Sequence, residues 1–169
     1  MAFGTTPAGT ITKEQTRLSI RRFPVANNAN ILKGDVCFQD TSGFLEQATS
    51  STAAGSEWYV ALEPANNTGG ASAAISCPVA AKGHFVTVVA DGAIQPGTPV
   101  KVSNSTSGRV KAFVTGTDAE GLKVGIYMGK EGGTIAKAGG SPYLESFTDN
   151  SDFVPVAAAL NDVIEILVR

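Results

Sequence analysis

The sequence predicts an all-β protein, either a small β-barrel or a β-sandwich, with two pseudo-repeated hairpin units, an extended N-terminal arm and a long glycine-rich loop. Three observations predict this class. Short runs alternate apolar and polar residues, clusters of Gly, Asn, Asp and Ser separate these runs, and one pattern of turn and strand occurs twice. A period of two is typical of strands that bury one face, and several such strands indicate a sandwich or barrel.

The first 30 residues lack a regular pattern. Pro7 and Pro24, with nearby glycines, interrupt any regular element, and the NNAN sequence at 27–30 marks a turn. We therefore predict an extended arm over residues 1–30. Such an arm is either mobile or lies along the domain surface or a partner.

The repeated pattern covers about residues 31–63 and 94–128. Each copy reads as a glycine turn, a strand, a TSG hairpin, a strand, a glycine-containing loop and a strand, with TSG at 41–43 and 106–108. Glycine supplies the positive φ that a tight hairpin needs, and Ser and Thr side chains bond to the turn backbone. Two copies are too few for a solenoid, so the repeat predicts a pseudo-symmetric barrel or sandwich.

The period of two is clear in two runs at equivalent places in the copies, 58–63 and 122–128. In the second run, Tyr127 falls on one face, and the other face carries Leu122, Val124, Ile126 and Met128. We expect each such strand to bury one face only.

The single β domain is predicted to span residues 31–169. The glycine-rich stretch at 129–153 is a long loop, and loops of this length are functional, disordered or pressed against a neighbour. The C-terminal residues fit a helical stripe as well as a strand. Their β-branched residues, close after Asn161 and Asp162, favour a closing strand at 163–168.

Charge and hydropathy argue against two classes of partner. The net charge of −2 and pI near 5.4 provide no basic face for nucleic acid. The one basic cluster, Arg17, Arg21 and Arg22, is interpreted as a solvated arm or a docking contact to an acidic partner. No apolar run approaches the ~20 residues that span a bilayer, and no signal peptide is recognisable, so we expect a soluble protein made in a cytoplasm.

The residues that could perform chemistry form no recognisable site. His84 is the only histidine, and one histidine cannot build a multi-histidine metal site. Cys37 and Cys77 match no metal spacing; a disulfide between them stays open, although free thiols are favoured. The glycine-rich stretches lack the Gly-Lys-Ser/Thr ending of a phosphate loop. We predict no catalytic residue, no cofactor and no metal.

Residues 31–169 resemble the small β-barrel head decoration proteins of tailed bacteriophages. The resemblance lies in the succession GDV, TSG, WYVALEPA, then AKGHFVTVVADGAIQPGTPVKVSNSTSGRV, KVGIYMGKEGG and DVIEILV. Its most typical motifs are Gly83-His84-Phe85-Val86, Gly97-Thr98-Pro99-Val100, Val124-Gly125-Ile126 and the strand from Val163 to Leu167.

The resemblance implies a capsid decoration (cement) protein on the outer surface of the virion, synthesised in the host cytoplasm. Its partner would be the major capsid protein, and a homo-oligomer, with a trimer favoured, would bridge adjacent subunits. Neither nucleic acid nor membrane would be bound. The expected partner contacts lie in the arm and the glycine-rich loop, at Arg17, Arg21, Arg22, Phe23, Tyr143 and Phe147.

Two other functions stay open at this point. A carbohydrate- or receptor-binding sandwich would present an exposed aromatic platform made from Trp58, Tyr59 or Tyr127. An enzyme would use Cys37 or His84, although neither lies in a recognisable nucleophile motif.

Overall fold

Short β-strands make up almost all the regular structure of the protein. The computed structural model describes residues 7–13, 20–49, 52, 57–131 and 153–169. In these ranges the one helical element is a single 3-10 turn, η1 (Glu120–Leu122). The predicted all-β class is therefore confirmed.

Two antiparallel sheets, called sheet A and sheet B, contain most of the strands. Along sheet A the order is β1 (Ile11–Lys13), β9 (Phe85–Val89), β14 (Val163–Val168), β12 (Lys123–Glu131), β10 (Pro99–Val102) and β11 (Val110–Ala112), with β13 (Phe153–Val154) paired to β12. Along sheet B the order is β2 (Arg21–Pro24), β8 (Ser76–Ala80), β6 (Tyr59–Ala61), β4 (Val36–Gln39) and β5 (Leu45–Gln47). A separate pair joins β3 (Asn30–Ile31) to β7 (Ala65–Asn66).

The two sheets repeat one topology. The first unit consists of β2, β4, β5, β6 and β8, and the second unit of β9, β10, β11, β12 and β14. When the five strands of each unit are numbered along the chain, their order across the sheet is first, fifth, fourth, second, third in both units. The pairing of Ile31 with Ala65 in the first unit also has a counterpart, the bridge between Ile94 and Ala158 in the second. The structural repeat is thus longer than 31–63 and 94–128, because each unit has an additional strand at both ends.

Neither sheet closes into a barrel. In each unit one isolated parallel bridge links the residue after the first strand to the start of the third strand. The bridge joins Val25 to Leu45 in the first unit and Ala90 to Val110 in the second. No ladder continues from these bridges in the described residues, so each sheet curls but stays open. The barrel alternative is therefore wrong, and the arrangement is sandwich-like.

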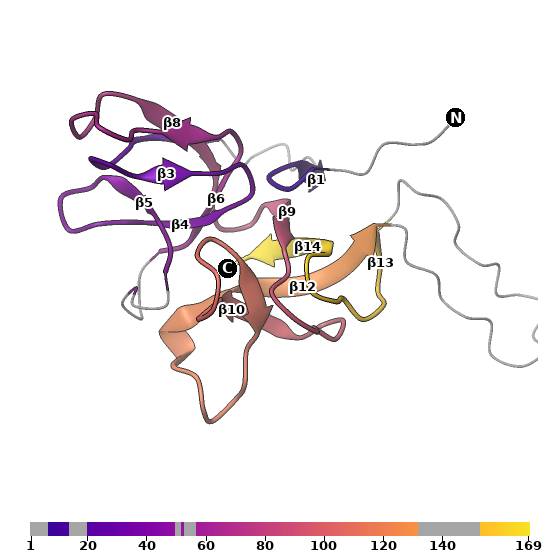
Figure 1. The fold of residues 1–169 in the computed structure, drawn as a ribbon. Helices are drawn as coiled ribbons and strands as arrows, with labels where there is room; N and C mark the ends of the chain where they lie inside the picture. Colours follow the sequence, from indigo (N-terminus) through magenta and orange to yellow (C-terminus); the bar gives the residue numbers. More distant parts are fainter. Residues whose placement is uncertain (1–6, 14–19, 50–51, 53–56, 132–152) are drawn as a thin grey trace, which may run out of the picture.

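Two hydrophobic cores fill the molecule, and one of them joins the units. The smaller core lies within the first unit and includes Leu45, Tyr59 and Val79. The larger core includes Val60 of the first unit together with Ile164 of the second. Figure 1 shows the purple strands of the first unit beside the orange and yellow strands of the second. Because apolar side chains from both units pack in one core, the units support each other.

The prediction that each strand buries one face is wrong for β6. Tyr59, Val60 and Ala61 are all buried, because β6 lies between the two cores and contributes side chains to both. In β12 the predicted burial phase is also wrong. The pairing of β12 with β10 is irregular between Lys123 and Gly125, and Val124 and Tyr127 both join the larger core although strict alternation put them on opposite faces.

The described part of the predicted N-terminal arm is built into the sheets. The segment 7–13 runs along β9, where the Gly9 N–H donates to the Thr87 carbonyl (2.6 Å) and the Thr87 N–H donates to the Thr10 carbonyl (2.9 Å). Gly9 has a φ of 72°, and a Cβ there would overlap the Ala61 carbonyl oxygen and the Gly34 amide nitrogen. This segment therefore contacts both units, and glycine is required where it passes between them.

Candidate functional site

Three of the six predicted partner contacts lie on β2, an outer strand of sheet B. Arg21 and Arg22 are exposed, and Phe23 is half-buried. The Phe23 ring packs against Tyr59, with ring centroids 4.9 Å apart. The structure therefore brings two cations and an aromatic anchor together on one strand. Arg17, Tyr143 and Phe147 lie outside the described residues.

The charges on β2 are weakly compensated by neighbouring groups. The Arg22 guanidinium lies 3.7 Å from the Glu63 carboxylate, and both side chains are more than half exposed. A pair of this kind contributes little to stability, because water screens it. Next to this strand Ile20 is an exposed large apolar residue, 53% accessible. The arrangement suits contact with a negatively charged, partly apolar surface.

The cysteines are poor candidates for nucleophilic catalysis. Cys37 and Cys77 are both buried and free, so they form no disulfide. Burial raises the pKa of the Cys37 thiol well above its usual range, and burial likewise raises the pKa of Cys77 to about 11. Since the thiolate is the nucleophile, both residues stay in the unreactive form near neutral pH.

His84 lies immediately before β9, and its neighbours are backbone groups. It is buried, its Nδ1 lies 3.0 Å from the Ala81 carbonyl, and its own carbonyl accepts a hydrogen bond from Val168 N–H (3.0 Å). The described residues contain no group of three or more His, Cys, Asp or Glu side chains that could hold a metal ion. In the same part of the chain, no helix has the length and apolar character needed to cross a membrane.

The aromatic residues proposed for a ligand platform are inside the protein. Trp58 is 4% exposed, Tyr59 2% and Tyr127 fully buried. The Trp58 indole N–H donates to the Gly121 carbonyl (3.1 Å) and so ties the first unit to η1 of the second. The Tyr127 hydroxyl donates to the Val156 carbonyl (2.6 Å). These three rings stabilise the body and present no stacking surface to a ligand.

A polar groove beside β3 and β5 was not predicted from the sequence. Its volume is about 480 Å³, and its polar lining comes from Asn27, Asn28, Asn30, Glu46 and Gln47. The turn at 27–28 contributes to the lining, and in it Asn28 has a φ of 58° and accepts a hydrogen bond from Gly69 N–H (2.9 Å). The sequence signal was the asparagine-rich stretch, which sequence reasoning interpreted only as a turn. Amide and carboxylate groups of this kind bind polar ligands by hydrogen bonds.

The second TSG hairpin forms a joint with the first unit. Gly108 is buried; its N–H donates to the Ala48 carbonyl (2.9 Å), and its carbonyl accepts from Val36 N–H (2.7 Å). A Cβ on Gly108 would overlap the Asp35 carboxylate and the Gln47 amide nitrogen. The hairpin is therefore an internal contact between the units and not a free binding loop.

Asp35 is the buried acid of this joint. Its Oδ2 accepts hydrogen bonds from Leu32 N–H (2.7 Å) and from the Gln47 amide (2.6 Å). Burial raises the pKa of Asp35, while these hydrogen bonds and the charge of Arg109 act in the opposite direction. The carboxyl group is thus held by donors from its own unit and lies against the hairpin of the other.

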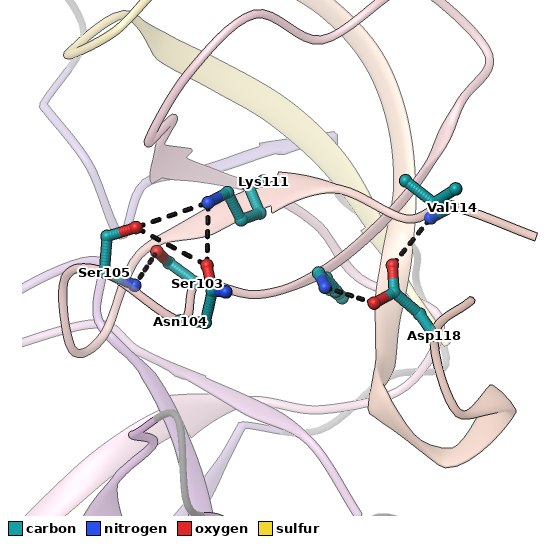
Figure 2. A network of polar contacts seen from close by, with 7 residues as sticks. Ser103, Asn104, Ser105, Lys111, Val114 and Asp118 are labelled. Carbon is teal, nitrogen blue, oxygen red and sulfur yellow. Dashed lines mark hydrogen bonds and ion pairs between the residues drawn. The ribbon is translucent and has the colours of Figure 1, made fainter.

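The rest of the second hairpin is fixed by its own polar side chains. Figure 2 shows Lys111, whose Nζ donates to Asn104 Oδ1 (2.7 Å) and to Ser105 Oγ (3.3 Å). Ser103 Oγ accepts from Ser105 N–H (3.0 Å). Further along the chain, Asp118 accepts from Val114 N–H and pairs with a lysine of β10. Contacts of this kind hold the hairpin in shape, and the network resembles no catalytic arrangement.

Comparisons with family models, with curated proteins and with solved structures found no match.

Proposed function

We propose that this chain is a structural protein of a tailed-phage virion, which decorates the outer surface of the capsid and bridges major capsid protein subunits, with a trimer as the favoured assembly. The proposal begins from the resemblance of residues 31–169 to head decoration proteins. The structural observation that carries it is the way in which the two units lock together.

In the part of the chain that the structure describes, contacts outside the shared core also connect the units. The Trp58 indole bonds to Gly121, Gly108 bonds to Val36 and Ala48, and the segment 7–13 contacts both units. A protein that holds neighbouring capsid subunits at a fixed distance needs a body that does not bend between its contacts. The locked double unit supplies such a body.

A capsid presents the same surface many times, which changes what each contact must achieve. Linked weak contacts gain avidity from effective concentration, so no single site has to bind strongly. Arg21 and Arg22 are exposed on β2, and a charged strand fits a weak, repeated contact better than a deep pocket would.

The proposal is tested by co-sedimentation of the purified protein with capsids built from the major capsid protein of the same genome, together with its mass in solution. We expect saturable binding and a mass above that of one chain, with three copies favoured. A monomer that leaves capsids and capsid protein unbound would contradict the proposal.

A polar-ligand-binding module is the second candidate, and the groove beside β3 and β5 is the observation that favours it. Carbohydrate hydroxyls could bond to Asn28 and Glu46 there. Screening of the intact protein on a glycan array, with Glu46→Gln as the matched variant, distinguishes this candidate. Binding that depends on Glu46 would support it, whereas capsid binding unchanged by Glu46→Gln would favour decoration.

A further inference from the structure

The first strands of the two units have different neighbours. In the second unit, β9 lies between β14 and β1, so both of its edges pair with strands. In the first unit, the strand in the same topological position is β2, which pairs with β8 alone in the described ranges. The isolated bridge to Leu45 involves Val25, beyond the end of β2. Among the described strands, none pairs with the outer edge of β2, whereas β1 covers the equivalent edge of β9.

We propose that the outer edge of β2 binds an extended acidic segment of another protein chain, which adds to sheet B as a further strand. An open edge presents backbone N–H and C=O groups at the spacing of a ladder, and strand addition is a recurring mode of peptide recognition. The pairing of β1 with β9 shows how such a strand sits in the other unit.

The charges on β2 identify the chemistry of the added strand. Arg21 and Arg22 are exposed, and side chains alternate along a strand, so the two cations project to opposite faces. A complementary strand therefore carries adjacent acidic residues, one for each face. Pro24 has no N–H, so pairing weakens at that end of β2.

The same charges argue against a second copy of this chain at the edge. Two β2 strands placed side by side would bring arginines opposite arginines, and like charges at facing positions destabilise a pair of strands. The β1 segment of a second copy is also unfavourable, because it contains Lys13 and no acidic residue in Pro7–Lys13. An acidic segment from a different protein remains as the occupant.

The test is independent of the capsid proposal, since it uses synthetic peptides and the full-length protein. The probe is a short blocked peptide of valine and threonine with two adjacent glutamates at its centre. Binding is followed through backbone amide shifts of the isotope-labelled protein. A second peptide has lysines in place of the glutamates, and a third is N-methylated at alternate amides so that it cannot form a ladder.

We expect the acidic probe to shift amides of residues 20–25 and to bind less tightly as salt is added. The double variant Arg21→Glu with Arg22→Glu should lose about tenfold or more in affinity, whereas Arg21→Lys with Arg22→Lys retains binding. The matched control, Lys33→Glu with Arg169→Glu, changes the net charge equally at exposed residues outside β2 and should bind normally.

Three results would overturn the proposal. The first is absence of binding at residues 20–25. The second is equal binding of the lysine peptide, which would remove the role of the arginines. The third is equal binding of the N-methylated peptide, which would show charge attraction without strand addition. Failure of capsid co-sedimentation would leave a positive peptide result unchanged.

Discussion

The two TSG hairpins have the same tripeptide and different roles. The first, at 41–43, is an external turn, and a Cβ on Gly43 would meet no atom within 4 Å. The second, at 106–108, docks into the first unit, and Gly108 is buried there. Both glycines have positive φ, 86° and 75°. The repeated sequence therefore specifies a backbone turn, and the position of the unit decides whether that turn faces solvent or a neighbour.

The first strands of the units differ in the same way. β9 and β2 occupy equivalent positions, yet β9 is covered by β1 and β2 is an outer strand. Within the described residues, the same topological position is thus covered in one unit and unpaired on one edge in the other.

The largest effect is expected from glycine replacement in the hairpins. Gly108→Ala combines the strain of a positive φ with overlap on Asp35 and should destabilise the protein by about 2–4 kcal/mol. Gly43→Ala has the strain alone and should cost about 1 kcal/mol. Urea unfolding measures both, with the exposed Ser107→Ala as a control near zero. Equal costs at the two glycines would contradict the difference in docking.

A smaller effect is expected where β1 covers β9. The Thr87 hydroxyl donates to the Pro7 carbonyl (2.7 Å) and accepts from Thr10 N–H (2.9 Å). Thr87→Val keeps the shape but leaves these groups unpaired, at a cost of about 1–3 kcal/mol. Hydrogen exchange at residues 9–13 should accelerate, while the exposed Thr115→Val should leave it unchanged. Unaltered exchange in Thr87→Val would show that this segment is held by other contacts.

The joint at Asp35 predicts a pH dependence. Burial raises the folded-state pKa of Asp35 above 3.8, so the folded protein binds the proton more tightly than the unfolded chain does. Its contribution to stability is therefore present at low pH and is lost as pH rises through the folded-state pKa. In urea titrations, the free energy of unfolding of the wild type minus that of Asp35→Asn should therefore fall as pH rises through the folded-state pKa of Asp35. If that free-energy difference stays constant or increases with pH, the folded-state pKa of Asp35 is not raised.

The smallest effect is expected at β2. Arg22→Ala and Glu63→Ala should each change the free energy of unfolding by less than about 0.5 kcal/mol, because the pair is exposed. Thermal unfolding of the two variants and their double variant checks this. A large loss would mean that Arg22 is needed for the fold, and would weaken the case that it serves a partner.

Sequence reasoning identified the repeat but not its full extent. The TSG turns are recognisable because glycine is required at their positive φ. The first and last strands of the units along the chain are not recognisably similar: β2 reads RRFP where β9 reads FVTVV, and β8 reads SCPVA where β14 reads VIEILV. Strands pair through their backbone groups, and many different side chains are compatible with the same pairing. The two units therefore share a topology even where their sequences differ.

Other features depended on tertiary contacts that local pattern does not contain. β6 buries both faces because it lies between two cores, and Tyr127 joins the same core as Val124 because the pairing of β12 with β10 shifts before it. Sequence reasoning proposed Arg21, Arg22 and Phe23 as partner contacts because they lie in the predicted arm, and this stays a prediction. It could not show that they belong to an outer strand, because that depends on which strand pairs with β2.

The most direct test of the central claim is residue-resolved amide hydrogen exchange in the full-length protein, comparing Arg21–Val25 with Phe85–Val89. We expect amides along β9 to be protected on both edges, amides on the outer edge of β2 to exchange fast, and the acidic probe to slow them. Protection of β2 equal to that of β9 in the free protein would show that the β2 edge is already covered, and would overturn the proposed strand addition.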